Sequence, residues 1–284
     1  MRSIKSTYLF VGEFDRRMIQ GHYYWYFQSA LTDKQCDDIM DLGLQGLEAN
    51  FTEHGEAGIS AQAGGDRSKI NEAGVERSVA AADKDYQQLA AEGVDQDNVF
   101  QRDSHVSWIN DQWVYDLLHG YLQKANEDSD WNFDIDFSET IQFTKYAPNQ
   151  FYGWHRDDAV EPYKTYDPEK HGDVFRKNEK GEYILNNFGD KILSPPYTSY
   201  REYDGKIRKL SISVNLTPDD TFKGGAFKID RGPHFAGERY WEAKELDTRG
   251  SIIIFPSFLY HQVTPVTEGV RYSIVMWNLG PPWK

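Results

Sequence analysis

The amino-acid sequence predicts a mainly β protein in which helices are confined to the N-terminal part. After residue 134, short segments alternate apolar and polar side chains, which is the pattern of a half-buried strand. Each segment ends at proline, glycine or aspartate, and no helical pattern separates one from the next. Many short strands without intervening helices are typical of a β-sandwich or barrel. We therefore expect one domain, with a helical and loop support over 1–134 and a β-core over 135–284.

The composition excludes several classes of protein. Of the 284 residues, 15% are aromatic, which is too many for a disordered chain. One cysteine, Cys36, cannot build a disulfide scaffold. No segment approaches the roughly 18 apolar residues of a membrane span. The formal net charge of −14 argues against a general nucleic-acid-binding protein, because binding phosphates needs a basic face. We expect a cytoplasmic protein that binds neither nucleic acid nor membrane.

The N-terminal part begins with an aromatic-rich segment, 22–29, that predicts a strand. Thr32 or Asp33 then offers a cap for a helix through residues 36–42. Residues 52–98 are rich in small and acidic side chains, and we expect a loop there with one short helix around 83–92. Further along, apolar residues recur every fourth position and predict an amphipathic helix over 108–125: Ile109, Trp113, Leu117 and Tyr121.

The C-terminal part supplies the predicted strands of the core. Alternating or continuous apolar runs predict them over 141–146, 210–216, 250–255 and 270–277. Between the first two strands, residues 159–206 show no regular period and form a predicted insertion loop. Loops of this length are frequently functional. We expect this one to act as a lid over a bound substrate.

Three residues in the core have the chemistry of a metal site. His155 and Asp157 are two positions apart on a predicted strand, so they face the same way. His261 follows the buried run at 250–255 and is the candidate third ligand. Two histidines and one carboxylate on one face of a metal form the facial triad of non-haem Fe(II) oxygenases. Iron is the favoured metal, although Mn, Co or Ni can occupy the same ligands.

A candidate anion-binding residue, Arg271, lies ten residues after His261. A predicted turn at 267–269 places the two residues on consecutive strands. An arginine inside a barrel and near a metal requires an anion. A dicarboxylic acid could chelate the metal at one end and pair with Arg271 at the other.

In this order, these residues resemble the Fe(II)- and 2-oxoglutarate-dependent dioxygenases, and within them the prolyl 4-hydroxylase-like branch. The family pattern is a tyrosine-rich approach to His-x-Asp, a distal histidine and a basic residue about ten positions later, all present here: Tyr146, Tyr152, His155, Asp157, His261 and Arg271. The Gly-Gly turn in 223–229 resembles the family as well. The resemblance implies a double-stranded β-helix core, which is a jelly-roll or cupin-like fold.

The resemblance also implies roles for individual residues. Tyr146 would bind 2-oxoglutarate or line its slot, and Ser213 or Thr144 would add a hydroxyl group to it. Tyr152 and Trp277 would line the substrate cavity. The implied cofactors are Fe(II), 2-oxoglutarate and O2, with ascorbate as the expected reductant. Collagen-type members usually carry lysine at the basic position, whereas this chain has arginine, as the oxygen-sensing type does.

The function implied by the resemblance is hydroxylation of a peptidyl residue, with proline as the first candidate and succinate and CO2 as co-products. The expected partner is therefore a peptide or protein. One alternative is hydroxylation of a free amino acid or another small molecule by the same iron centre. The other is a non-catalytic cupin-like module that binds a metal or carboxylate ligand.

Overall fold

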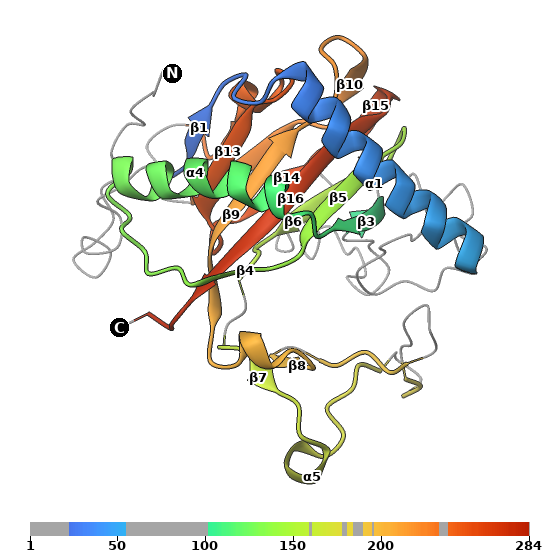
Figure 1. The fold of residues 1–284 in the computed structure, drawn as a ribbon, viewed down its shortest axis with the longest axis vertical. Coiled ribbons are helices and arrows are strands. Elements are labelled where there is room, and N and C mark those ends of the chain that lie inside the picture. Colours follow the sequence, from blue (N-terminus) through green and yellow to red (C-terminus); the bar gives the residue numbers. More distant parts are fainter. Residues whose placement is uncertain are drawn as a thin grey trace.

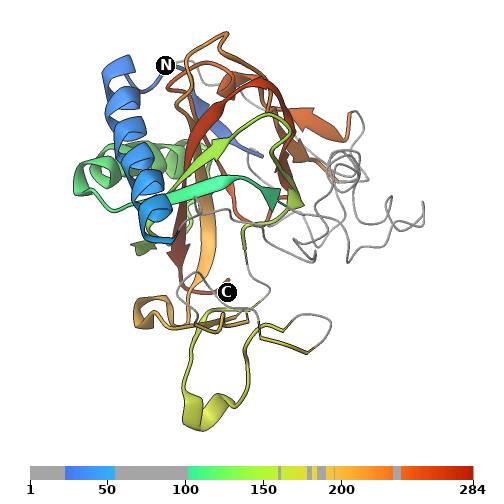
Figure 2. The ribbon, with the colours of Figure 1, turned by 90° about the vertical axis from the view of Figure 1, so that its right-hand side faces the viewer.

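The computed structural model describes residues 23–54, 102–158, 161–177, 181–183, 190–194, 196–232 and 238–283. The short helix expected around 83–92 lies outside these residues. In the described part, two antiparallel sheets face each other, and helices α1 (Asp33–His54) and α4 (Gln112–Asp128) cross the outer face of the larger sheet (Figures 1 and 2). None of the described helices is both long and apolar enough to cross a membrane.

The larger sheet contains the predicted strands of the C-terminal part. Its hydrogen-bonded order is β1 (Trp25–Phe27), β13 (Ile252–Pro256), β9 (Ile207–Asn215), β16 (Arg271–Gly280), β5 (Ile141–Tyr146) and β3 (His105–Ile109), with β4 (Phe137–Ser138) also paired to β16. The expected strands over 141–146, 210–216, 250–255 and 270–277 are thereby confirmed. The aromatic-rich segment at 22–29 forms edge strand β1.

The smaller sheet lies against the inner face of the larger one. Its order is β12 (Tyr240–Glu242), β11 (Phe227–Asp230), β14 (His261–Val263), β6 (Phe151–His155) and β2 (Arg102–Asp103). From β5 onward the chain alternates between the larger and the smaller sheet, through β6, β9, β11, β13, β14 and β16. This alternation is a double-stranded β-helix, so the expected fold class is confirmed. A short ribbon, β10 (Phe222–Gly224) with β15 (Val266–Gly269), extends it.

Alternation along the strands gives the larger sheet two different faces. The side chains of Phe143, Ile212 and Ile274 face the helices and join one buried core with Ile39 and Leu118. The intervening positions face the smaller sheet and line a pocket, with Gln142, Ser213, Ser273 and Trp277 among them. Because strand side chains alternate between faces, the same strands build the core and the pocket.

The helix expected over 108–125 is real, but its beginning and its buried face were predicted wrongly. Residues 105–109 pair with β5 as a strand, so the helix begins only after Asp111. The face packed against the sheet then carries Val114, Leu118, Leu122 and Ala125. Trp113, from the predicted stripe, is instead 39% exposed. Because the preceding residues pair as a strand, the helix begins later than predicted. Its buried face therefore lies one residue further along the chain than the predicted stripe.

The described parts of the 159–206 segment extend away from the barrel (Figures 1 and 2). They include β7 (Lys164–Thr165), α5 (Pro168–His171), β8 (Tyr197–Thr198) and the 3-10 turn η3 (Arg201–Tyr203). Two backbone hydrogen bonds join the ends of this segment, from Tyr163 N to Lys206 O at 2.9 Å and from Gly205 N to Tyr163 O at 2.8 Å. The segment therefore leaves and rejoins the barrel at one point.

Candidate metal centre

The three predicted metal ligands come from the ends of two neighbouring strands in the smaller sheet. His155 is the last residue of β6, His261 is the first residue of β14, and the two are paired across the sheet. Asp157 lies just beyond β6 rather than on it. The backbone N–H groups of Asp157 and Asp158 both donate to Ser257 O, at 2.9 and 3.1 Å. This turn therefore holds the carboxylate beside the two imidazoles.

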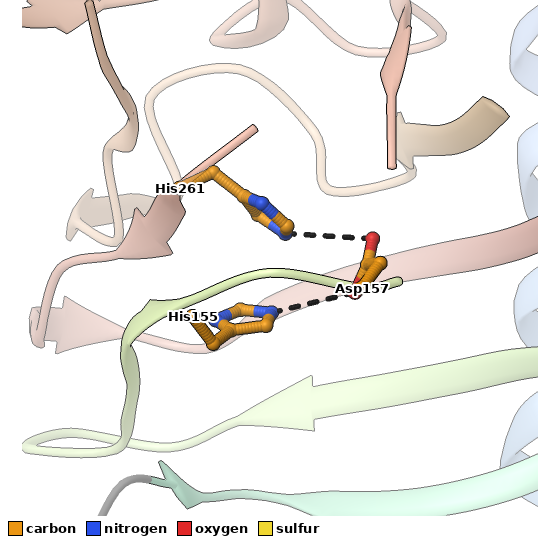
Figure 3. Close-up of side chains that lie close together, drawn as sticks. All are labelled: His155, Asp157 and His261. Atoms are coloured by element: carbon orange, nitrogen blue, oxygen red, sulfur yellow. Dashed lines mark ion pairs between the residues drawn. The ribbon is translucent and has the colours of Figure 1, made fainter. Parts of the chain in front are cut away.

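The ligand atoms of the triad converge on one point (Figure 3). The His155 Nε2 atom is 3.5 Å from Asp157 Oδ1, and the His261 Nε2 atom is 3.6 Å from Asp157 Oδ2. One candidate ligand atom from each residue lies within 4.8 Å of the others. All three residues are buried, at 4–8% exposure. The distances are longer than good hydrogen bonds, as expected for ligands around a space that a metal ion would fill.

Hydrogen bonds on the far side of each imidazole orient it toward this point. His155 Nδ1 lies 2.8 Å from Gly153 O, and His261 Nδ1 lies 2.9 Å from Leu259 O. A backbone carbonyl only accepts, so each Nδ1 carries a proton, and it is the Nε2 atom of each ring that points to the common centre. Within the described structure, Asp157 Oδ2 is buried without a hydrogen-bond partner. Two imidazole nitrogens and an orphaned carboxylate oxygen fit a divalent transition metal.

The electrostatics of the triad favour the protonation states that bind metals. Burial tends to raise the pKa of Asp157, but the two imidazoles and Arg208 outweigh it and lower the pKa overall. Burial, together with His155, lowers the pKa of His261 to about 4. Near pH 7, Asp157 is therefore ionised and His261 is neutral. Metal ligands must be in these forms to bind.

The triad forms one wall of a pocket between the sheets. The sequence-predicted residues Tyr146, Tyr152, Ser213, Arg271 and Trp277 line it too. The lining is completed by residues that the sequence did not single out: Arg102, Gln142, Phe227, Phe255, Val263, Ser273 and Val275. Thr144 is not among the lining residues, and its hydroxyl accepts hydrogen bonds from Arg102 and Gln142.

Arg271 presents a buried positive charge to the pocket. Arg271 is 2% exposed. Its guanidinium donates to Ser273 Oγ at 3.2 Å and lies 5.8 Å from the centre of the Tyr146 ring. Burial lowers the pKa of Arg271, yet a guanidinium remains charged near neutral pH. Among the described residues, no carboxylate forms an ion pair with it. A buried charge without a partner is costly, so this position is suited to an anionic ligand.

Tyr152 packs directly against His155, one of the three candidate metal ligands. The ring centres of Tyr152 and His155 are 3.4 Å apart and the planes differ by 9°. Burial raises the pKa of Tyr152 to about 12, so its phenol stays protonated. The ring therefore fixes the plane of His155 while it lines the pocket.

One important arginine near the centre was missed by the sequence analysis. Arg208, on β9, forms a bidentate ion pair with Glu139, and both nitrogen–oxygen distances are 2.6 Å. Its guanidinium also lies 4.2 Å from the Trp277 ring centre. The available signal was a pair of basic residues, Arg208 and Lys209, directly before the predicted strand at 210–216. Its partner, however, is 69 positions away in the sequence.

Comparisons with known proteins agree with this geometry. Residues 141–278 match the sequence profile of the 2OG-Fe(II) oxygenase superfamily. A PKHD-type hydroxylase of Shewanella sp. (strain MR-7) is 36% identical over 120 residues, which cover 42% of this chain and 45% of that relative. One from Idiomarina loihiensis is 28% identical over 104 residues, which cover 37% of this chain and 40% of the relative. The matched segment thus spans less than half the length of these relatives.

Solved structures give a weaker likeness over a longer stretch. The viral collagen prolyl hydroxylase of Paramecium Bursaria Chlorella virus-1, in a 2OG complex, aligns over 92% of this chain and 97% of its own, with 14% identity and a TM-score of 0.47. The profile match over 141–278 contains the whole triad and Arg271. Over this segment, which is slightly less than half of the chain, the sequence matches the 2OG-Fe(II) oxygenase superfamily.

Proposed function

We propose that the protein is an Fe(II)- and 2-oxoglutarate-dependent dioxygenase that hydroxylates a peptidyl residue, with proline as the first candidate. The observation that carries this proposal is one pocket in which three convergent metal ligands face a buried, unpaired arginine. A bound Fe(II) would couple the oxidative decarboxylation of 2-oxoglutarate by O2, giving succinate and CO2, to hydroxylation of the substrate. Ascorbate is the proposed reductant that keeps the iron in its ferrous state.

The protein side chains divide the remaining work. His155, Asp157 and His261 would hold the metal on one face and leave its opposite face open toward the pocket. Arg271, with Ser273 beside it, would bind the carboxylate of the co-substrate that is remote from the metal. Phe227 and Phe255 stack near His261, at ring-centre distances of 5.4 and 4.6 Å, and exclude water from that side of the centre.

A peptide substrate is supported by Trp277, on the C-terminal half of β16. The indole N–H of Trp277 is buried, lines the pocket and has no hydrogen-bond partner in the described structure. It is thus available to donate to a peptide carbonyl. The segment at 161–206 rejoins the barrel two residues before Arg208, which packs on the same indole. The PKHD-type hydroxylase names of the relatives support hydroxylation as the reaction.

The test is turnover of 2-oxoglutarate to succinate by the full chain with Fe(II) and ascorbate. Proline-rich peptides, free proline and no substrate are compared. We expect peptides to stimulate turnover, His155→Ala to abolish it, and Arg271→Ala to raise the KM for 2-oxoglutarate by about 10-fold or more. Trp283→Ala, at the exposed C-terminal end, is the matched control and should leave turnover unchanged.

Other outcomes would redirect the proposal. Stimulation by free proline or lysine, but not by peptides, would favour the small-molecule alternative. A metal-loaded protein that binds 2-oxoglutarate, yet consumes no O2 with any substrate, would favour the non-catalytic module. If replacing 164–205 by a short turn left peptide turnover unchanged, the lid role of this segment would be refuted.

A further inference from the structure

A second buried guanidinium lines the same pocket as Arg271. Arg102, on the short strand β2, is 4% exposed and is paired across the sheet with Tyr152. Its guanidinium carbon lies 4.7 Å from the centre of the Tyr152 ring, on which it packs. A single arginine is enough to pair with one remote carboxylate. The second one therefore needs its own explanation.

The hydrogen bonds of Arg102 leave its charge without a counterion. Its Nε atom donates to Ser104 Oγ at 2.7 Å. The two terminal nitrogens donate to Gln142 Oε1 at 3.3 Å and to Thr144 Oγ1 at 3.4 Å. All three acceptors are neutral, and the last two bonds are long. Over the ranges that the structure describes, no carboxylate forms an ion pair with Arg102. The terminal nitrogens can therefore exchange weak contacts for a charge-assisted one.

The two guanidiniums approach the same place from two strands. Arg271 donates to Ser273 on β16, and Arg102 donates to Thr144 on β5. Ser273 and Thr144 are directly opposite each other in the larger sheet. The two guanidiniums therefore donate to the two members of one cross-strand pair, on neighbouring strands that lie about 4.8 Å apart. The only carboxylate in the pocket lining, Asp157, faces the two histidines instead.

We propose that Arg102 is a second anion-binding residue, which shares the remote carboxylate of the co-substrate with Arg271. The inference rests on the proposed function, because that function supplies the dicarboxylate. The paired guanidiniums select a ligand with a carboxylate at its remote end over one of equal length without it. Arg102 thereby contributes to co-substrate specificity, and its contact with Tyr152 holds it in place.

The test is isothermal titration calorimetry of the full chain loaded with Mn(II) in the absence of O2. The probes are 2-oxoglutarate and 2-oxopentanoate, which keeps the chelating end and lacks the remote carboxylate. We expect Arg102→Gln to weaken 2-oxoglutarate binding by about 10-fold or more, and to change 2-oxopentanoate binding by less than about 2-fold. Arg102→Lys keeps the positive charge but loses the planar guanidinium that can donate two parallel hydrogen bonds. Its affinity for 2-oxoglutarate should fall between those of the wild type and Arg102→Gln.

Arg249→Gln is the matched control, because Arg249 lies outside the pocket and contacts Asp33, Asp37 and Leu216 O. It should bind both probes as the wild type does. Equal losses for the two probes in Arg102→Gln would overturn the proposal, because Arg102 would then act on the chelating end through Tyr152 and His155. Unchanged binding of both probes would overturn it as well.

A third probe separates failure of this inference from failure of the proposed function. Glutarate carries two carboxylates and no oxo group, so its binding to metal-free protein depends on the arginines alone. If wild-type protein did not bind 2-oxoglutarate, the proposed function would fail, and loss of glutarate binding in Arg102→Gln would still decide the role of Arg102. Thermal melting followed by circular dichroism verifies that each variant is folded. If Arg102→Gln does not fold, the Arg102→Lys comparison decides.

Discussion

Arg208 donates a hydrogen bond to the backbone carbonyl oxygen of Asp157, at 3.1 Å. The same guanidinium pairs with Glu139 and packs on Trp277. One partly buried arginine thus connects the backbone of a candidate metal ligand to an aromatic wall of the pocket. Glu139 in turn raises the pKa of Arg208, although burial acts against it. The position of the carboxylate in the triad therefore depends on a residue that does not itself bind the metal.

Glu139→Gln tests this connection. The substitution leaves a largely buried guanidinium without its counterion, so we expect a loss of about 2–4 kcal/mol in the free energy of unfolding. Mn(II) affinity, measured by calorimetry, should fall as well, because Asp157 loses its orientation. Asp136→Asn is the control, since the Asp136–Lys206 pair is more exposed and should cost less than about 1 kcal/mol. Equal effects of the two substitutions would contradict the connection.

Metal binding should depend on all three residues of the triad. We expect His155→Ala, Asp157→Ala and His261→Ala each to weaken Mn(II) or Co(II) binding by at least about 100-fold, since each removes one of three protein ligands. His119→Ala is the control, because His119 lies on α4 and contacts Ser138. Equilibrium dialysis with metal analysis measures the affinity. Retention of wild-type affinity in any one triad variant would remove that residue from the ligand set.

Two helical glycines should respond oppositely to alanine. A Cβ atom at Gly43, on α1, would lie 2.2 Å from the buried ring of Phe143. We expect Gly43→Ala to destabilise the protein by about 1–3 kcal/mol, because the core has no room for it. A Cβ at Gly120, on α4, meets no described atom within 4 Å. Gly120→Ala should therefore stabilise by about 0.5–1 kcal/mol through helix propensity.

Denaturant unfolding of the two variants measures these changes. Because both substitutions add the same methyl group to a helix, any difference in sign comes from packing. Destabilisation by Gly120→Ala, or stabilisation by Gly43→Ala, would show that α1 and α4 do not pack on the sheet as described.

Cys36 should be unreactive in the native protein. Its side chain is fully buried on α1, and burial raises the pKa of the thiol to about 11. Since the thiolate is the reactive form, about one molecule in a thousand is reactive at pH 8, and that fraction rises about tenfold per pH unit below the pKa. Iodoacetamide labelling followed by mass spectrometry should show slow modification, and rapid modification after unfolding in guanidinium chloride. Rapid labelling of native protein would place the thiol at the surface.

Much of the fold and of the candidate site could be predicted from local patterns. The strand over 141–146 alternates because one of its faces packs on helices and the other lines the pocket. His155 could be found because it precedes Asp157 by two positions, and His261 because it follows the buried run at 250–255. The structure pairs the two histidines across neighbouring strands. Arg271 could be found from its position ten residues after His261, but the predicted turn at 267–269 was wrong: Val266–Gly269 is strand β15, and His261 and Arg271 lie in different sheets. The spacings from His155 to Asp157 and from His261 to Arg271 are short in sequence, and the residues they link reach the same pocket in the fold.

The remaining features depend on contacts between distant residues. Arg208 depends on Glu139, and Arg102 enters the pocket on a strand of only two residues, which has no period to detect. Thr144 lies on the predicted strand, but its hydroxyl is taken by Arg102 and Gln142. The buried face of α4 was misjudged because a strand precedes it directly. In each case the position of the residue is decided by a contact in the folded protein that the local sequence pattern does not reveal.

The two ends of the segment between Tyr163 and Lys206 are hydrogen-bonded to each other, and this has a consequence for evolution. Two backbone hydrogen bonds bring its ends together, so everything between them can be lengthened, shortened or exchanged without shifting the register of β6 or β9. One end follows Asp157 closely and the other precedes Arg208 by two residues, and these two residues are themselves hydrogen-bonded. New specificity can therefore be acquired beside the reaction centre by insertion of sequence, while the metal-binding barrel is inherited unchanged.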